Sequence, residues 1–164
     1  DLPMPSSFTA ILPAPFGRLG LCEAHDALTA LVFLPTDTPL QSPPFGSLSA
    51  LAAQRLHAYF IDPHTPLADL PYQLTGTPFQ LRVWQAMLTI PVGATQRYGE
   101  LATQLGSAPR AVGGACGRNP LPLIVPCHRI VAATGMGGFN QGKLETMLGI
   151  KHWLLQHEAA HLAQ

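Results

Sequence analysis

The sequence has 164 residues, of which 47% are hydrophobic and 11% charged, and its formal net charge is zero. This composition excludes a disordered chain, and no apolar run reaches the length of a membrane span. A chain of this length buries ~70% of its unfolded surface, so it can fold as one large domain or two small ones without disulfides.

The cysteines indicate the compartment. Cys22, Cys116 and Cys127 are odd in number and far apart, which argues against a disulfide framework and favours the reducing cytoplasm. Residues 1–20 lack the charged start and continuous apolar core of a signal peptide. We therefore expect a cytoplasmic protein that is not attached to a membrane.

The charges are unevenly distributed along the chain. Residues 1–75 hold six acidic and two basic residues, a net charge of −4, whereas residues 76–130 hold five arginines and one glutamate, a net charge of +4. A basic middle segment in a neutral chain favours a polyanionic partner. Chance placement of a few charges is the alternative.

The first half of the chain predicts a small antiparallel sheet followed by a helix. Short segments rich in Phe, Val, Leu and Thr, separated by Pro, Gly and Asp, are typical of strands and occupy residues 7–12, 16–24 and 27–35. Residues 46–61 follow a helical period with one expected inner face: Leu48, Leu51, Ala52, Arg55, Leu56 and Tyr59. Prolines then dominate an extended segment. We expect an N-terminal sheet domain over residues 1–62 and a linker over residues 63–77.

The second half, residues 78–164, predicts a helical domain. Pro78 suits the first turn of a helix, Gly106 can end the next one and Ser107 can cap the one that follows. The expected helices cover residues 78–90, 97–106, 109–118 and 150–162. For the first of them the expected inner face is Phe79, Val83, Ala86 and Met87.

Two of these helices, joined by a tight turn, are similar to a helix-turn-helix. The second helix is unusual because its glycines, Gly113, Gly114 and Gly117, each cost about 1 kcal/mol relative to alanine. A helix faced with glycine can approach another backbone closely, in protein or in nucleic acid. Arg110 at its start and Arg118 at its end could meet phosphates. Tight packing inside the protein is the alternative.

One short segment, PLIVPCHRIV at residues 122–131, places Cys127 beside His128 in an apolar run. The thiolate is the reactive form of cysteine, and a neighbouring imidazole can take its proton directly or through a water. An imidazole works best in this role when a carboxylate orients it. The pair therefore suggests a nucleophile and its base, with core packing as the alternative.

The motifs across residues 78–158 resemble those of the O6-alkylguanine-DNA alkyltransferases, which repair DNA by direct reversal. The most characteristic is Pro-Cys-His-Arg, here Pro126 to Arg129. In the family order this sequence also has Phe-Gln-x-x-Val-Trp from Phe79, Ile-Pro-x-Gly-x-Thr from Ile90, Tyr-x-x-Leu-Ala from Tyr98, Arg-Ala-Val-Gly from Arg110, Asn-Pro at Asn119 and Trp-Leu-Leu-x-x-Glu from Trp153. Residues 1–75 match the family only loosely.

The resemblance implies a role for each matching residue of the reaction. Cys127 would accept the alkyl group, His128 would activate it through a bridging water, and Glu158 would orient His128. Tyr98 would donate a hydrogen bond toward the departing base and help rotate the nucleotide out, and Asn119 would brace the turn that carries the cysteine. The thioether product is stable, so each molecule would act once, without metal or cofactor.

The resemblance also implies the fold and the partner. The chain would be an α+β protein, with a ribonuclease-H-like N-terminal sheet and helix followed by a helical domain that contains a helix-turn-helix. The partner would be double-stranded DNA containing O6-alkylguanine, bound by a monomer. The second helix of the motif would enter the minor groove, with Arg110 filling the gap left by the extruded base. The expected DNA contacts are Gln80, Arg110, Ala111, Gly113 and Gly114.

The sequence departs from the family pattern between residues 135 and 149. Relatives commonly carry Gly-Tyr-x-Gly-Gly in the loop that closes the base pocket, whereas here Phe139 stands near the tyrosine position and the glycine pair is missing there. The interval from Cys127 to Glu158 is also a few residues longer than in the commonest form. The substrate range, including alkyl size and O4-alkylthymine, therefore stays open.

Other interpretations of the reactive residues lead to different functions. HEAAH at residues 157–161 matches the zinc-protease pattern, but Glu158 already has a place in the alkyltransferase pattern. We expect Arg129 and Cys116 to be structural, although Cys116 could also lie near DNA, and Cys22 to belong to the core. A protein that recognises alkylated DNA without transfer is a second hypothesis, and a thiol hydrolase that uses Cys127 and His128 is a third.

Overall fold

The computed structural model describes residues 7–133 and 146–160. The chain divides into two compact units, Asp1–Leu74 and Thr75–Gln164, each with its own internal contacts. Among the helices in the described part, none is long and apolar enough to cross a membrane.

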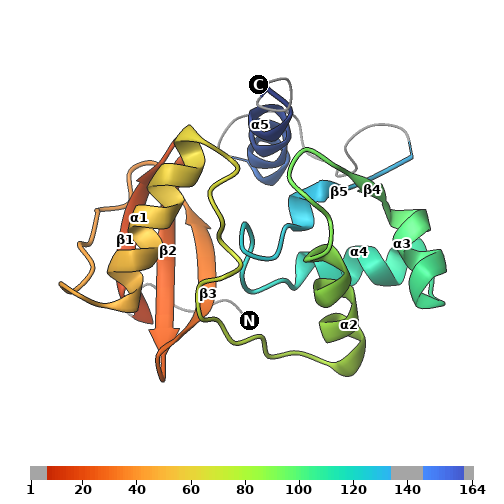
Figure 1. Cartoon of the computed structure of the whole chain (residues 1–164), viewed down its shortest axis with the longest axis horizontal. Helices are drawn as coiled ribbons and strands as arrows, with labels where there is room; N and C mark the ends of the chain where they lie inside the picture. Colours follow the sequence, from red (N-terminus) through yellow and green to blue (C-terminus); the bar gives the residue numbers. More distant parts are fainter. Residues whose placement is uncertain (1–6, 134–145, 161–164) are drawn as a thin grey trace. The chain divides into compact units, whose positions relative to one another are not determined.

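The first unit contains a three-stranded antiparallel sheet with one helix against it. The strands are β1 (Ala10–Ala14), β2 (Gly17–Ala24) and β3 (Ala27–Leu34), in the order β1-β2-β3. Helix α1 (Leu48–Ile61) lies along the sheet and contacts all three strands (Figure 1). His25 and Asp26 both adopt positive φ, which gives the tight turn between β2 and β3 the twist that a hairpin needs. The three predicted strands are confirmed, with β1 beginning three residues later than expected.

The buried face of α1 differs from the prediction. Ser47 caps the helix by accepting a hydrogen bond from the Ala50 N–H at 3.1 Å. Ser49 is fully buried because its backbone N–H and its hydroxyl both donate to Glu23, at 3.0 and 2.7 Å. This contact turns Leu51, which was expected inside, toward solvent with 43% of its surface exposed. The remaining buried side chains are those expected: Ala52, Leu56 and Tyr59.

The segment that follows α1 is partly attached to the sheet. The Leu28 N–H donates to the Pro71 carbonyl and the Gln73 N–H donates to the Leu28 carbonyl, both at 2.9 Å. This pairing beside β3 satisfies backbone groups that a free linker would leave to water. The boundary between the two compact units lies after Leu74.

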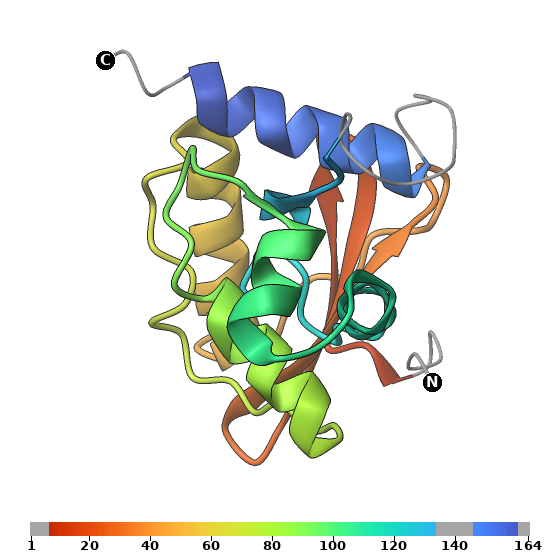
Figure 2. The same ribbon diagram turned by 90° about the vertical axis from the view of Figure 1, so that its right-hand side faces the viewer.

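The second unit is mainly helical. Its elements are α2 (Pro78–Met87), β4 (Gln96–Arg97), α3 (Tyr98–Leu105), α4 (Pro109–Gly117), a 3-10 turn (Cys127–Arg129), β5 (Ile130–Val131) and α5 (Met147–Ala160). Strands β4 and β5 pair in parallel, and α2, α3 and α4 contact one another. Helix α5 runs past the 3-10 turn in both views (Figures 1 and 2). The four predicted helices are present, and the last begins three residues before the expected Ile150.

Helix α2 begins with a complete capping box. The Gln80 N–H donates to the Thr77 hydroxyl at 3.1 Å, and the Thr77 N–H donates to the Gln80 side chain at 3.0 Å. The Gln80 side chain, which was expected to contact DNA, thus forms a capping hydrogen bond at the start of α2. The inner face includes Trp84, which the prediction omitted: it is 1% exposed and its indole N–H donates to the Ala115 carbonyl of α4 at 2.8 Å. This bond allows a polar ring to be buried between helices.

A left-handed residue separates α3 from α4. Gly106 has φ +65° and ends α3, and the Ser107 N–H donates back to the Ala102 carbonyl at 2.8 Å. The prediction that Ser107 caps α4 is wrong. The N-cap is Ala108, and it makes no side-chain cap bond. Pro109 in the first helical position explains the shift, because it forces the residue before it into an extended conformation.

Candidate active site

Cys127 opens a single 3-10 turn that is braced from within the second unit. Its N–H donates to the Val125 carbonyl at 2.8 Å. The buried Asn119 amide donates to the same carbonyl at 2.9 Å, and its side-chain oxygen accepts from the Leu121 N–H at 3.0 Å. Asn119 therefore fixes the path of the chain immediately before Cys127, whose side chain stays partly exposed.

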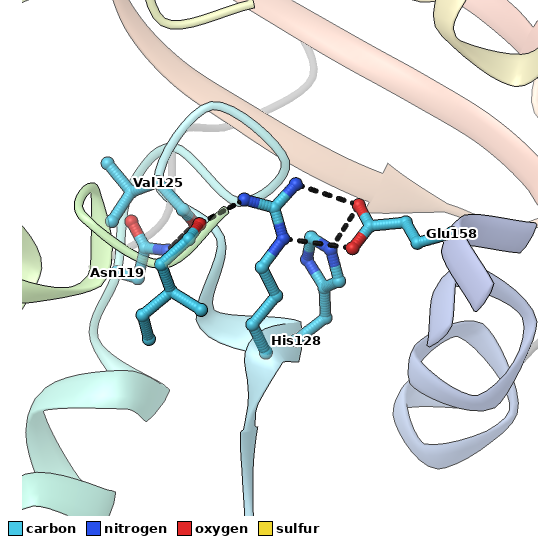
Figure 3. A network of polar contacts seen from close by, with 6 residues as sticks. Asn119, Val125, His128 and Glu158 are labelled. Atoms are coloured by element: carbon cyan, nitrogen blue, oxygen red, sulfur yellow. Dashed lines mark hydrogen bonds and ion pairs between the residues drawn. The ribbon is translucent and has the colours of Figure 1, made fainter. Parts of the chain in front are cut away.

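His128 and Arg129 converge on one carboxylate from α5. Figure 3 shows Glu158 pointing toward His128, with a separation of 2.9 Å between Nε2 and Oε2. Arg129 donates through Nε to Oε1 and through Nη2 to Oε2, each at 2.9 Å. Its third nitrogen, Nη1, donates to the Ile90 carbonyl at 2.6 Å. His128, Arg129 and Glu158 are 5%, 8% and 1% exposed, so the network is dry and its bonds are strong.

The bond to Glu158 determines which nitrogen of His128 can accept a proton. A carboxylate only accepts hydrogen bonds, so Nε2 carries the proton and Nδ1 of the neutral ring holds the lone pair. Nδ1 is buried and has no partner in the described part of the chain. Burial is the main cause that lowers the pKa of His128; Glu158 opposes it, and the positive charges of Arg129 and Lys151 reinforce it. The imidazole is therefore neutral at physiological pH and can accept a proton.

Cys127 rests as a thiol. Burial raises the pKa of Cys127, while a hydrogen bond from the Asn119 side chain and the charge of Lys151 oppose the rise. A thiol that is not ionised in advance needs a base at the moment of reaction. The next residue, His128, has the neutral ring and the unpartnered Nδ1 that such a base requires.

Tyr98 stands at the start of α3 as a second proton-bearing group. Burial, followed by the charges of Cys116 and Cys127, raises its pKa to about 12, so the phenol stays protonated. Lys151 Nζ lies 3.5 Å from the Tyr98 hydroxyl and 5.5 Å from the centre of its ring. The ammonium group can only donate. The hydroxyl oxygen therefore accepts from Lys151, and its own proton is available to another acceptor.

Helix α4 presents a smooth basic face to solvent. Arg110, Ala111, Gly114 and Arg118 are exposed. Neither arginine has a partner among the described residues, and a Cβ added to Gly114 would meet no described atom within 4 Å. Gly113 lies closer to the protein, where an added Cβ would be 4.0 Å from the Tyr98 ring, an ordinary contact. Packing inside the described part of the chain therefore does not require these glycines.

Comparison with known proteins supplies the family. The family model "6-O-methylguanine DNA methyltransferase, DNA binding domain" matches residues 78–160. The chain belongs to the O6-methylguanine-DNA methyltransferase family. It is 43% identical over 142 residues to the methylated-DNA–protein-cysteine methyltransferase of Mycobacterium bovis. The aligned region covers 79% of this chain and 84% of that protein. It is 36% identical over 148 residues to a probable enzyme of the same name from Acanthamoeba polyphaga mimivirus, covering 86% and 96% of the two chains.

A solved structure of the same family has the same architecture. Mycobacterium tuberculosis OGT in complex with DNA superposes with a TM-score of 0.74 at 39% identity, covering 92% of this chain and 91% of that one. The small three-stranded antiparallel sheet and the five α-helices of the described residues thus match the methyltransferase fold.

The candidate residues fall into two groups in this family member. Cys127, His128, Glu158 and Asn119 belong to one connected set of contacts, and the charge of a Cys127 thiolate is one of the causes that raise the pKa of Tyr98. Arg110, Ala111 and Gly114 lie together on the exposed face of α4, whereas Gln80 caps α2. The altered loop at residues 135–149, with Phe139, lies mostly outside the described residues.

Two residues of the site were missed or undervalued by sequence reasoning. Lys151 was not singled out, although it lies seven positions before Glu158 and hence on the same face of a helix. Arg129 was expected to be structural. Its two hydrogen bonds to Glu158 could not be predicted, because the two residues lie far apart in the sequence. Glu158 is committed to Arg129 and His128, which leaves it unavailable as the base of a zinc protease. No group of three or more candidate metal ligands occurs within the described ranges.

Proposed function

We propose that this protein repairs O6-alkylguanine in duplex DNA by irreversible transfer of the alkyl group to Cys127, acting as a monomer and once per molecule. Direct reversal by alkyl transfer to a cysteine is the activity of its family. The observation that carries the assignment to Cys127 is the unpartnered Nδ1 of His128, which is held in its basic form by Glu158 beside a protonated thiol.

The transfer needs only side chains and a substitution at carbon. His128 Nδ1 removes the Cys127 proton, directly or through one water, as the sulfur attacks the alkyl carbon. The new S–C bond forms while the C–O bond breaks, and its electron pair leaves with guanine O6. The proton taken from Cys127 passes on from His128 to the departing guanine anion through water, so the products are a thioether, unmodified guanine and neutral His128. No step regenerates the thiol.

Tyr98 and Lys151 supply the stabilisation of the leaving base. The departing guanine carries negative charge, and a fixed donor aimed at that charge lowers the barrier. The Tyr98 proton is free for this purpose because Lys151 occupies the phenol oxygen. The nearby ammonium group also favours the thiolate that forms at Cys127.

Helices α3 and α4 are proposed to form a helix-turn-helix that inserts α4 into the minor groove. The exposed glycine face allows close approach of the DNA backbone, and Arg110, without a partner in the described part of the chain, can fill the space left by the extruded base. The expected contacts are Gln80, Arg110, Ala111, Gly113 and Gly114. In this arrangement residues 78–164 act on DNA, while residues 1–62 form a ribonuclease-H-like sheet domain joined by residues 63–77.

Replacing Gly114 by leucine should separate stability from DNA binding. The side chain meets no described atom, and leucine gains up to about 1 kcal/mol over glycine in a helix, so unfolding should occur at equal or higher denaturant concentration. Affinity for duplex DNA should fall about tenfold or more, because a bulky side chain blocks close approach. Fluorescence anisotropy with labelled duplex measures the affinity. Gly99→Leu, at an equally open position of α3, is the control; equal affinity in both variants would contradict the insertion of α4.

The proposed reaction is tested by mass spectrometry. The protein is mixed with duplex DNA carrying one O6-methylguanine, and the intact mass and peptide masses are followed with time. We expect one added methyl group per molecule on the Cys127 peptide, none on the Cys22 and Cys116 peptides, and none with unmodified duplex. Tight binding without transfer would support the recognition protein instead, and turnover of an ester without DNA would support the hydrolase.

A further inference from the structure

Arg129 uses all three of its side-chain nitrogens in buried hydrogen bonds. It places two nitrogens on the two oxygens of Glu158, and the third reaches the carbonyl of Ile90 at the end of the segment that follows α2. Two hydrogen bonds thus hold the guanidinium against the carboxylate that also contacts His128. Bidentate geometry of this kind specifies orientation as well as charge.

The charge of Arg129 adds to burial in opposing the transfer of a second proton to His128. A buried carboxylate paired with histidine alone is stabilised by drawing a proton onto the ring, which makes a buried ion pair. An imidazolium has N–H groups at both nitrogens and no lone pair, so it cannot act as a base. With Arg129 present, part of the negative charge of Glu158 is offset, so the pull of the carboxylate on a second ring proton is weaker.

We propose that Arg129 is a positioning residue of the transfer reaction: it neutralises and orients Glu158 so that His128 keeps a proton on Nε2 and a free lone pair on Nδ1. This inference rests on the proposed function of Cys127 and His128. It assigns to the fourth residue of Pro-Cys-His-Arg a task in the chemistry, although Arg129 touches neither the thiol nor the substrate.

The surroundings of His128 support this assignment. The charged groups that act on it are Glu158 and Lys151 from α5 and its own neighbour Arg129. Helix α2, which also packs against the 3-10 turn, contributes the buried side chains Val83, Trp84 and Met87, none of them charged. Glu158 is thus the single anion acting on His128 within the described residues, and the two cations both oppose protonation of the ring.

The test is the pH dependence of single-turnover transfer to Arg129→Gln. Loss of the guanidinium should let Glu158 protonate His128, so the rate near pH 7 should fall about tenfold or more and recover toward the wild-type value at alkaline pH. The midpoint of the profile should move up by about one pH unit or more. Arg129→Lys keeps the positive charge but cannot make the bidentate contact with Glu158. The midpoint of its pH profile should therefore lie between those of the wild type and Arg129→Gln. Arg82→Gln, which removes another arginine bonded to a carbonyl (Leu105, 2.9 Å), should keep the wild-type profile.

A double variant distinguishes charge control from loss of packing. In Arg129→Gln with Glu158→Gln, the amide oxygen can still accept from His128 Nε2, but no buried anion remains to protonate the ring. The midpoint of the pH profile of the double variant should return toward the wild-type value. If Arg129 were merely structural, the transfer rate of the single variant would fall equally at every pH, and that of the double variant would fall further. A transfer rate that falls equally at every pH in the single variant, or a pH profile of the single variant identical to that of the wild type, would overturn the proposal.

Nitrogen NMR of labelled histidine gives a readout that does not depend on transfer. In wild-type protein near pH 7, His128 should show Nε2 protonated and Nδ1 unprotonated, and in Arg129→Gln both nitrogens should be protonated. The same ionisation state in both proteins would refute the role of Arg129. If the ring states change as expected while wild-type protein transfers no alkyl group, the proposed function fails and the electrostatic role of Arg129 stands.

Discussion

Replacement of Glu158 by alanine should be the most damaging change outside the acceptor cysteine. It leaves the guanidinium of Arg129 buried without its counter-ion and removes the partner that fixes His128. Breaking a buried ion pair from one side costs about 3–5 kcal/mol, a large part of the stability of a domain this size. The transfer rate should also fall about a hundredfold or more, because the base loses its orientation. Urea unfolding and single-turnover transfer measure the two effects.

A glutamate with a local, exposed role is the control for this prediction. Glu100 accepts the N–H of Arg97 at the start of α3, at 2.8 Å, and is exposed. Glu100→Ala should cost about 1 kcal/mol and leave the rate of the chemical step unchanged. If Glu158→Ala unfolded no more readily than Glu100→Ala, the buried network would not be the anchor of the second unit.

Cys127→Ser should abolish alkyl transfer while leaving the fold and DNA binding intact. A hydroxyl of similar size keeps the partly exposed position, but it is a far weaker nucleophile whose proton His128 cannot remove efficiently. We expect the rate to fall about a thousandfold or more, below detection in the mass experiment. Binding to alkylated duplex should persist, since Cys127 contributes chemistry and not the basic surface of α4.

The matched substitution for this variant is Cys22→Ser. Cys22 lies in the sheet of the first unit and is 6% exposed, so a hydroxyl there lowers stability but leaves the acceptor in place. That variant should take up one methyl group as wild type does. Uptake by Cys127→Ser at a comparable rate would show that another residue is the acceptor.

The regular elements could be read from local signals. Alternating segments between turn residues predicted β1, β2 and β3, and helical periods with Pro78 and Gly106 at their limits predicted α2 and α3. The errors arose where a distant contact or a nearby proline overrode a local preference. Ser49 is buried because Glu23 receives it, so Leu51 faces water. Capping by Ser107 fails because Pro109 dictates the conformation of Ala108.

Only part of the site was predicted, because several of its contacts join residues that lie far apart in the sequence. Cys127, His128 and Glu158 could be named because they stand in motifs, and the contact between His128 and Glu158 is present. Arg129 donates hydrogen bonds to Glu158 and Ile90, which lie 29 and 39 positions away in the sequence. The bond between Lys151 and Tyr98 joins residues 53 positions apart. No pattern within one element encodes such distances. Periodicity along α5 is the one signal that could have placed Lys151 beside Glu158.

The contact between His128 and Glu158 closes an interval of 30 positions through buried atoms alone. The entropy of closing such an interval grows slowly, by about 0.6 kcal/mol for each doubling of its length. Changes of chain length between β5 and α5 can therefore accumulate at small thermodynamic cost, whereas Arg129 and Lys151, which lie in the same interval, contact the site and must be kept. The departure from the family pattern between Cys127 and Glu158 falls inside that interval. On the function proposed above, we expect the range of accepted lesions to change through this segment while the contact between His128 and Glu158 is kept.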